Sequence, residues 1–147
     1  HLPCDVITRR LITEKLAAFN GPKRRATVAE VIAALQEFPE QRRAATQPTV
    51  RLGAADRLAG RVTVAMAGYT SGGVDVLRAY FEAGVGTVLM MHFPEADVRE
   101  AREQNLPGNL VVTGHMASDS IGINVFLDEL QRLGVTVVRA GGIVNPQ

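Results

Sequence analysis

The sequence predicts an α/β fold with a mixed, mainly parallel sheet flanked by helices. From Arg61 onward, apolar segments of strand length alternate with segments of helical periodicity, as in the crossover units of a parallel sheet. The chain has 147 residues, enough for one domain with its own core. Hydrophobic residues make up 46% of it, which excludes a disordered chain.

The first third of the chain is expected to be helical. Residues 6–19 place apolar side chains at helical spacing until the stretch NGP ends the pattern. In the stretch TVAE, Thr27 and Glu30 form a capping box, which predicts a second helix up to Phe38, before a proline. Residues 39–60 show no clear period and are expected to form a surface connection with one short element at most.

The rest of the chain is expected to alternate between strands and helices. The expected strands are 61–68, 86–92, 109–115 and 135–143, and the expected helices are 73–84, 94–104 and 120–134. No internal repeat is visible, and the length of the chain fits one domain. Residues 1–147 are therefore expected to form a single domain.

Composition excludes several classes of function. The net charge of +1 gives no electrostatic reason to bind nucleic acid or a membrane surface. The single cysteine, Cys4, excludes an internal disulfide. No apolar run approaches the ~18 residues of a membrane span, and no signal peptide is present, so a cytoplasmic location is expected. The chain begins with His1 rather than methionine, and we expect an N-terminal portion to be missing.

Two histidines directly follow predicted strands. His92 ends the stretch TVLMMH, and His115 ends the stretch VVTGH. Because the carboxyl ends of parallel strands gather at one edge, both imidazoles are expected to reach a common cleft if the two strands are neighbours. Histidine is the commonest metal ligand and a proton shuttle near neutral pH. The alternative is an ordinary histidine hydrogen-bonded at a strand end.

Carboxylates accompany histidines at a repeated spacing. Asp119 lies four residues after His115, and the two share a face if this segment is helical. The alternative is that Asp119 or a neighbouring serine caps the helix. His1 and Asp5 repeat the spacing before the first predicted helix, where Asp5 is alternatively an N-cap.

A Gly-rich turn lies between a predicted strand and helix, in the stretch AGYTSGG. The backbone amides of such a turn can hold phosphate. The candidate phosphate-binding residues are Thr70, Ser71, Gly72 and Gly73. The turn lacks the lysine of a P-loop and the G-x-G-x-x-G spacing, so the alternative is a tight turn without a ligand.

Three stretches together resemble the NIF-three-like family, known as GTP cyclohydrolase type 2 homologs with dinuclear metal centres. GHMASDSIGINVFLDELQRLGVTVV resembles the closing motif of the family. VTVAMAGYTSGGVDVLRAYFEAGVGTVLM is similar to its preceding strand, Gly-rich turn and helix, and HLPCD resembles its His-Thr-x-Leu-Asp segment. The order of the stretches agrees, and the resemblance spans almost the whole chain.

The resemblance implies a metal site. It implies that Asp5, His115 and Asp119 are ligands of one or two divalent metal ions. Nitrogen and oxygen ligands suit zinc, manganese or iron, and three of them suffice for one ion with an open position. His1 and His92 are the candidate catalytic residues, as proton shuttles. The chain departs from the family in three respects: Asp119 replaces the usual glutamate, His92 stands where relatives tend to have an acidic residue, and the family's adjacent pair of histidines is absent.

The resemblance also implies an activity. A metal-activated hydroxide would attack the purine C8 of GTP, while residues 69–73 hold the triphosphate. The expected substrate is therefore a small molecule, with a nucleotide as the family's example. One alternative is a non-catalytic metal-binding scaffold that acts through protein contacts, and another is a nucleotide-binding module without metal. Family members form ring-shaped hexamers, which implies a homo-oligomer.

Overall fold

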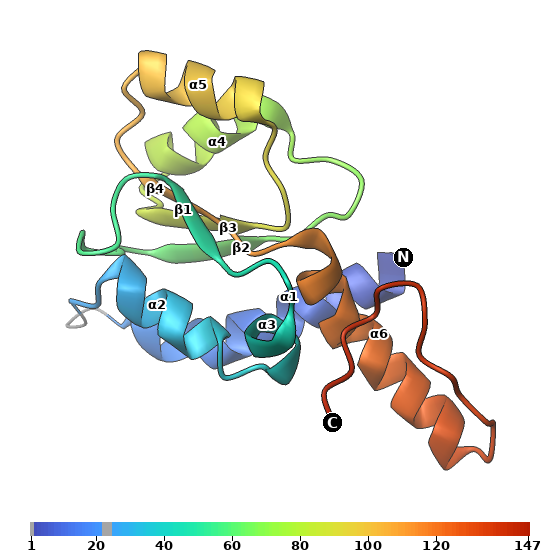
Figure 1. Cartoon of the computed structure of the whole chain (residues 1–147). Coiled ribbons are helices and arrows are strands. Elements are labelled where there is room, and N and C mark those ends of the chain that lie inside the picture. Colours follow the sequence, from blue (N-terminus) through green and yellow to red (C-terminus); the bar gives the residue numbers. More distant parts are fainter. Residues whose placement is uncertain (1, 22–24) are drawn as a thin grey trace.

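A four-stranded mixed sheet forms the centre of the molecule, with helices on both faces (Figure 1). The computed structural model describes residues 2–21 and 25–147. The strands are Thr49–Leu52 (β1), Val62–Ala65 (β2), Thr87–Met90 (β3) and Asn109–Val112 (β4), in the spatial order β1-β4-β3-β2. β2, β3 and β4 are parallel, whereas β1 runs antiparallel to β4. The predicted α/β class with a mixed, mainly parallel sheet is confirmed.

The helices lie in two layers. They are Leu2–Leu16 (α1), followed by the 3-10 helix Ala17–Asn20 (η1), Val28–Leu35 (α2), Pro39–Arg43 (α3), Gly73–Glu82 (α4), Glu95–Glu103 (α5) and His115–Arg132 (α6). α4 and α5 cover one face of the sheet, and α1 and α2 cover the other (Figure 1). In the described part of the chain, no helix is long and apolar enough to cross a membrane.

Strand β3 is buried on both faces, as expected of a central parallel strand. Leu89 packs with Ile12 of α1 and Val31 of α2. Its neighbour Val88 points to the other face and packs with Leu77 of α4. Because successive side chains of a strand alternate between faces, β3 joins the two apolar clusters into one core.

The capping box is confirmed. The Thr27 hydroxyl accepts a hydrogen bond from the Glu30 amide at 3.3 Å, and the Glu30 carboxylate accepts one from the Thr27 amide at 2.7 Å. The helix that follows ends at Leu35, three residues before the predicted end at Phe38. Pro39 begins α3 instead. Proline fits this position because the amide hydrogens of the first helical turn have no partner within the helix.

The prediction for residues 39–60 is corrected, because this segment holds two elements rather than one at most. It contains α3 and the edge strand β1. β1 has four residues, of which Leu52 alone is buried, so its sequence shows no alternation long enough to reveal a strand.

The predicted strand at 135–143 is wrong. These residues form no strand and run back beside α6 (Figure 1). The Arg139 guanidinium donates to the Asn124 side-chain oxygen at 2.9 Å, and the Asn124 amide donates to the Val144 carbonyl at 2.9 Å. The valine-rich pattern favours a strand, but the segment is hydrogen-bonded to α6 through these side chains and does not join the sheet, and Val138 is left 83% exposed.

Candidate functional site

Two predicted strand-end histidines lie together. β3 and β4 are neighbours, and Met90 pairs with Val112 in the last register position of both strands. Beyond these ends, the rings of His92 and His115 stack with centroids 5.2 Å apart and planes 19° from parallel. Both imidazoles therefore lie at the same edge of the sheet, as expected for histidines that follow neighbouring parallel strands.

His115 and Asp119 occupy the first turns of α6, which begins five residues before the predicted start at Ser120. Gly114 precedes the helix with φ of 86°, a backbone conformation that favours glycine. Four residues apart on one helix face, the His115 Nε2 and Asp119 Oδ2 atoms lie 3.2 Å from each other.

The capping alternative does not describe this helix. Asp119 lies inside α6 and is buried, with 3% of its surface exposed. The neighbouring serines donate backwards to carbonyls, Ser118 to Gly114 at 2.7 Å and Ser120 to Met116 at 2.6 Å. None of the three side chains satisfies an amide at the helix start.

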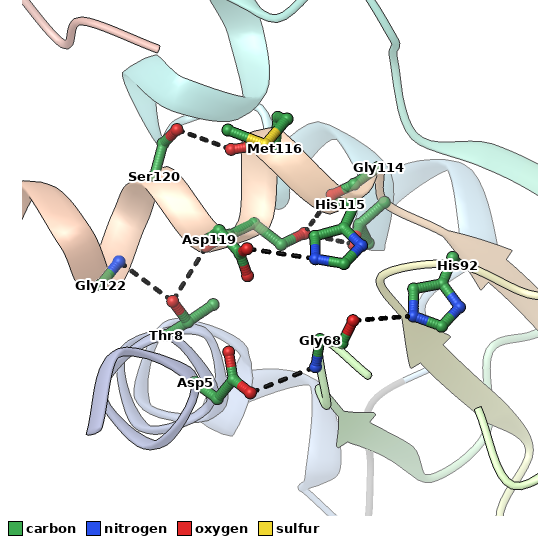
Figure 2. A network of polar contacts seen from close by, with 12 residues as sticks. Asp5, Thr8, Gly68, His92, Gly114, His115, Met116, Asp119, Ser120 and Gly122 are labelled. Atoms are coloured by element: carbon green, nitrogen blue, oxygen red, sulfur yellow. Dashed lines mark hydrogen bonds and ion pairs between the residues drawn. The ribbon is translucent and has the colours of Figure 1, made fainter. Parts of the chain in front are cut away.

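Asp5 reaches the same place from α1, although it lies more than 100 residues away in the chain. It is buried inside α1 rather than at its N-cap, and it points toward Asp119 across the space between the two helices (Figure 2). Its Oδ2 atom accepts a hydrogen bond of 3.1 Å from the Gly68 amide. The Gly68 carbonyl lies 3.4 Å from His92 Nε2, so one residue of the loop after β2 contacts both sides of the site.

The close crossing of α1 and α6 sets this arrangement. A Cβ atom on Gly122 would lie 2.2 Å from the Cys4 carbonyl oxygen, so only glycine permits the approach. The Thr8 hydroxyl donates to the Ser118 carbonyl at 2.9 Å and accepts from the Gly122 amide at 3.0 Å. Thr8 and Gly122 were not singled out in the sequence, where a threonine and a glycine within helices carry no distinctive spacing.

The electrostatics of the site favour a cation. Burial raises the pKa of the Asp119 carboxyl above its ordinary value, the adjacent His115 opposes this rise, and the negative charge of Asp5 adds to it. Two carboxylates that face each other in a buried place are unfavourable unless positive charge lies between them.

The donor set fits a divalent metal in its chemistry. Two carboxylates and an imidazole are the nitrogen and oxygen ligands that zinc, manganese and iron accept. Within residues 2–21 and 25–147, however, no three histidine, cysteine, aspartate or glutamate side chains already form a group able to hold an ion. His1, the other predicted catalytic residue, lies outside the described residues.

The Gly-rich turn has the backbone of a tight turn. Gly72 and Gly73 have φ values of 73° and 69°, which side chains rarely adopt. Their amides donate to the hydroxyls of Thr70 and Ser71, at 3.1 and 3.3 Å. The two glycine amides are therefore engaged within the turn itself.

The chain is similar in sequence and in fold to a protein of known structure. No protein-family model matches the sequence, and no curated protein matches it. Among solved structures, the chain is similar to a NIF3 superfamily protein from Sphaerobacter thermophilus, with 39% identity and a TM-score of 0.87. The match covers 97% of this chain and 52% of the other, so the chain spans about half the length of that protein.

Two more distant structures share the fold. A Bacillus cereus protein related to NIF3 is 16% identical with a TM-score of 0.50, over 76% of this chain and 29% of its own. A Staphylococcus aureus protein is 10% identical with a TM-score of 0.50, over 78% of this chain and 31% of its own. At these identities the likeness concerns the fold alone.

Proposed function

The chain belongs to the NIF3 superfamily, and from this premise we propose that it binds a divalent metal and hydrolyses a small-molecule substrate. The proposed ligands are Asp5, His115 and Asp119. The observation that carries the proposal is the convergence of two buried carboxylates and an imidazole from opposite ends of the chain. Burial, and to a smaller extent the charge of Asp5, raise the pKa of Asp119, and a divalent cation would stabilise the charged carboxylate against both.

The proposed chemistry assigns separate roles to the metal and the protein. A bound zinc, manganese or iron ion lowers the pKa of water and supplies a nucleophile near neutral pH. His92 is half-buried, stacks on His115 and directs Nε2 at the Gly68 carbonyl. We assign proton transfer to its other ring nitrogen, Nδ1, because a neutral imidazole can accept a proton there near pH 7.

Elemental analysis of the purified protein tests the metal proposal. We expect at least one ion per chain, and we expect Asp5→Asn, His115→Ala and Asp119→Asn each to lower the metal content while the circular dichroism spectrum is retained. Asp75→Asn is the matched control, because Asp75 is an 89% exposed carboxylate on α4. If the three variants unfold and the metal content per folded molecule is unchanged, these residues are structural and the proposal fails.

Turnover is tested separately, with GTP as the first probe because the family resemblance implies it. His92→Gln should retain the metal and lose at least about tenfold in rate, since general acid–base groups typically contribute 10²–10⁴-fold. A wild-type protein that holds metal without turnover of GTP or other small phosphate esters would refute the hydrolase and favour the non-catalytic scaffold.

We further propose that the protein is a homo-oligomer. The C-terminal half of α6 projects from the body of the molecule (Figure 1), and Phe126, Leu133 and Val138 expose 53%, 64% and 83% of their surface. A second copy of the chain that packed on this region would bury these apolar side chains. Sedimentation should give a mass above that of one chain, and Phe126→Glu should lower it. Leu58→Glu, on a 52% exposed leucine elsewhere, is the control.

A further inference from the structure

A cavity lies beside the candidate metal ligands, and neither the packing of the core nor the proposed metal site uses it. It has a volume of about 310 Å³ and lies along the edge strand β2, between α1 and the Gly-rich turn. A second cavity of about 150 Å³ borders Asp5. Arg9, Met66 and Ala67 line both cavities, so they adjoin one another at these residues.

The polar groups of the larger cavity are hydrogen-bond donors. The Thr70 and Ser71 hydroxyl oxygens already accept amide hydrogens, which leaves each O–H free to donate. Tyr80 also lines this cavity, and among the described residues no carboxylate does. Within the described residues, no ion pair involves the Arg9 guanidinium. A wall of this composition is complementary to an anion.

The position of Arg9 relates this cavity to the candidate metal ligands. Arg9 follows Asp5 by four residues on α1, so the two share a helix face with a rise of about 6 Å between them. A small molecule held by its anionic group at Arg9 would therefore place atoms a few bonds away beside Asp5. The apolar side chains of Val64 and Val76 line the space for the uncharged part of such a molecule.

We propose that Arg9, Thr70 and Ser71 bind the anionic group, a phosphate or a carboxylate, of a small organic substrate whose reacting part lies at Asp5. This inference rests on the proposed function and specifies its substrate class. Arg9 was not among the residues that the sequence singled out, because a single arginine in a helix ordinarily lies on a solvated face.

Binding of simple anions tests the inference. The wild-type protein is titrated with inorganic phosphate, and separately with acetate, and binding is followed by NMR shifts before and after removal of metal by a chelator. We expect at least one anion to bind, and Arg9→Gln to weaken it about tenfold, as the loss of a charge-assisted contact predicts. Both arginines are exposed on α1, but only Arg9 lines the cavities, so Arg10→Gln makes the same charge change outside them and should have little effect.

The outcomes separate this inference from the proposed function. Stronger binding of phosphate or of acetate identifies the anionic group, and either supports the site. Absence of binding of both anions, or equal weakening by Arg9→Gln and Arg10→Gln, overturns it. Metal content is measured on the same samples. Protein that is purified without metal, before any chelator is added, and that shows Arg9-dependent anion binding refutes the metal proposal alone. Protein that holds metal but binds anions without dependence on Arg9 refutes the anion site alone.

Discussion

The crossing of α1 and α6 at Gly122 makes a strong prediction. In Gly122→Ala, the added methyl group would lie 2.2 Å from the Cys4 carbonyl oxygen, whereas ordinary contacts begin at 3.4 Å. The obstacle is a backbone atom, so no side-chain rotation relieves it. The two helices must therefore separate locally by about 1.2 Å, the difference between these distances.

Two opposing energies decide the effect on stability. Overpacking of a buried contact costs typically 1–3 kcal/mol. Replacing glycine by alanine inside a helix stabilises the helix by up to about 1 kcal/mol, because alanine has the higher helix propensity. The packing cost is larger, because both helix backbones are buried here and Thr8 hydrogen-bonds across the same turn. We expect Gly122→Ala to lower the free energy of unfolding by about 1–2 kcal/mol.

The same displacement affects the candidate ligands. Metal–ligand distances tolerate only about 0.2 Å, so a shift of the α1 backbone near Asp5 by roughly 1 Å should lower metal affinity at least about tenfold. Urea denaturation and elemental analysis measure the two effects. Gly21→Ala is the control, because Gly21 has φ of −70° and the new Cβ would lie at an ordinary contact distance of 3.8 Å from the Ala18 carbonyl oxygen. Unchanged stability and metal content in Gly122→Ala would refute the role assigned to the crossing.

Three further substitutions test the packing that holds the site. Thr8→Val removes two buried hydrogen bonds and should cost about 1–3 kcal/mol in urea denaturation, whereas the exposed Thr13→Val should change little; equal effects would contradict this. Thr27→Ala removes the capping box and should cost about 1 kcal/mol, and a neutral result would exclude a stabilising cap. Leu89→Ala should cost about 2–5 kcal/mol by calorimetry, and a loss below 1 kcal/mol would contradict a close-packed core.

The fold was predictable where periodicity was long enough to act as a signal. The alternation from Arg61 to α6 reflects burial on both faces of parallel strands, and the structure has those elements. The edge strand β1 escaped prediction because four residues carry too little pattern. The segment 135–143 has the composition of a strand, but Arg139 is hydrogen-bonded to Asn124 and Asp128 of α6, and local composition does not indicate such contacts.

The candidate site was predictable only in part. The edge rule for parallel strands brought His92 and His115 together, and helical spacing placed Asp119 beside His115. Spacing alone did not predict that Asp5 lies near them; that expectation came from the family resemblance. The contacts of the Gly68 backbone with Asp5 and His92 carry no side-chain signature, so no sequence pattern indicates them.

Thr8 and Gly122 explain how the two buried carboxylates Asp5 and Asp119 are held close to each other. Repulsion between Asp5 and Asp119 favours separation of α1 and α6. One turn away, the Thr8 hydroxyl and the glycine contact oppose that separation with hydrogen bonds and close backbone packing. The packing of the two helices thus preorganises the candidate ligands, and under the proposed function a cation would not have to pull the helices together.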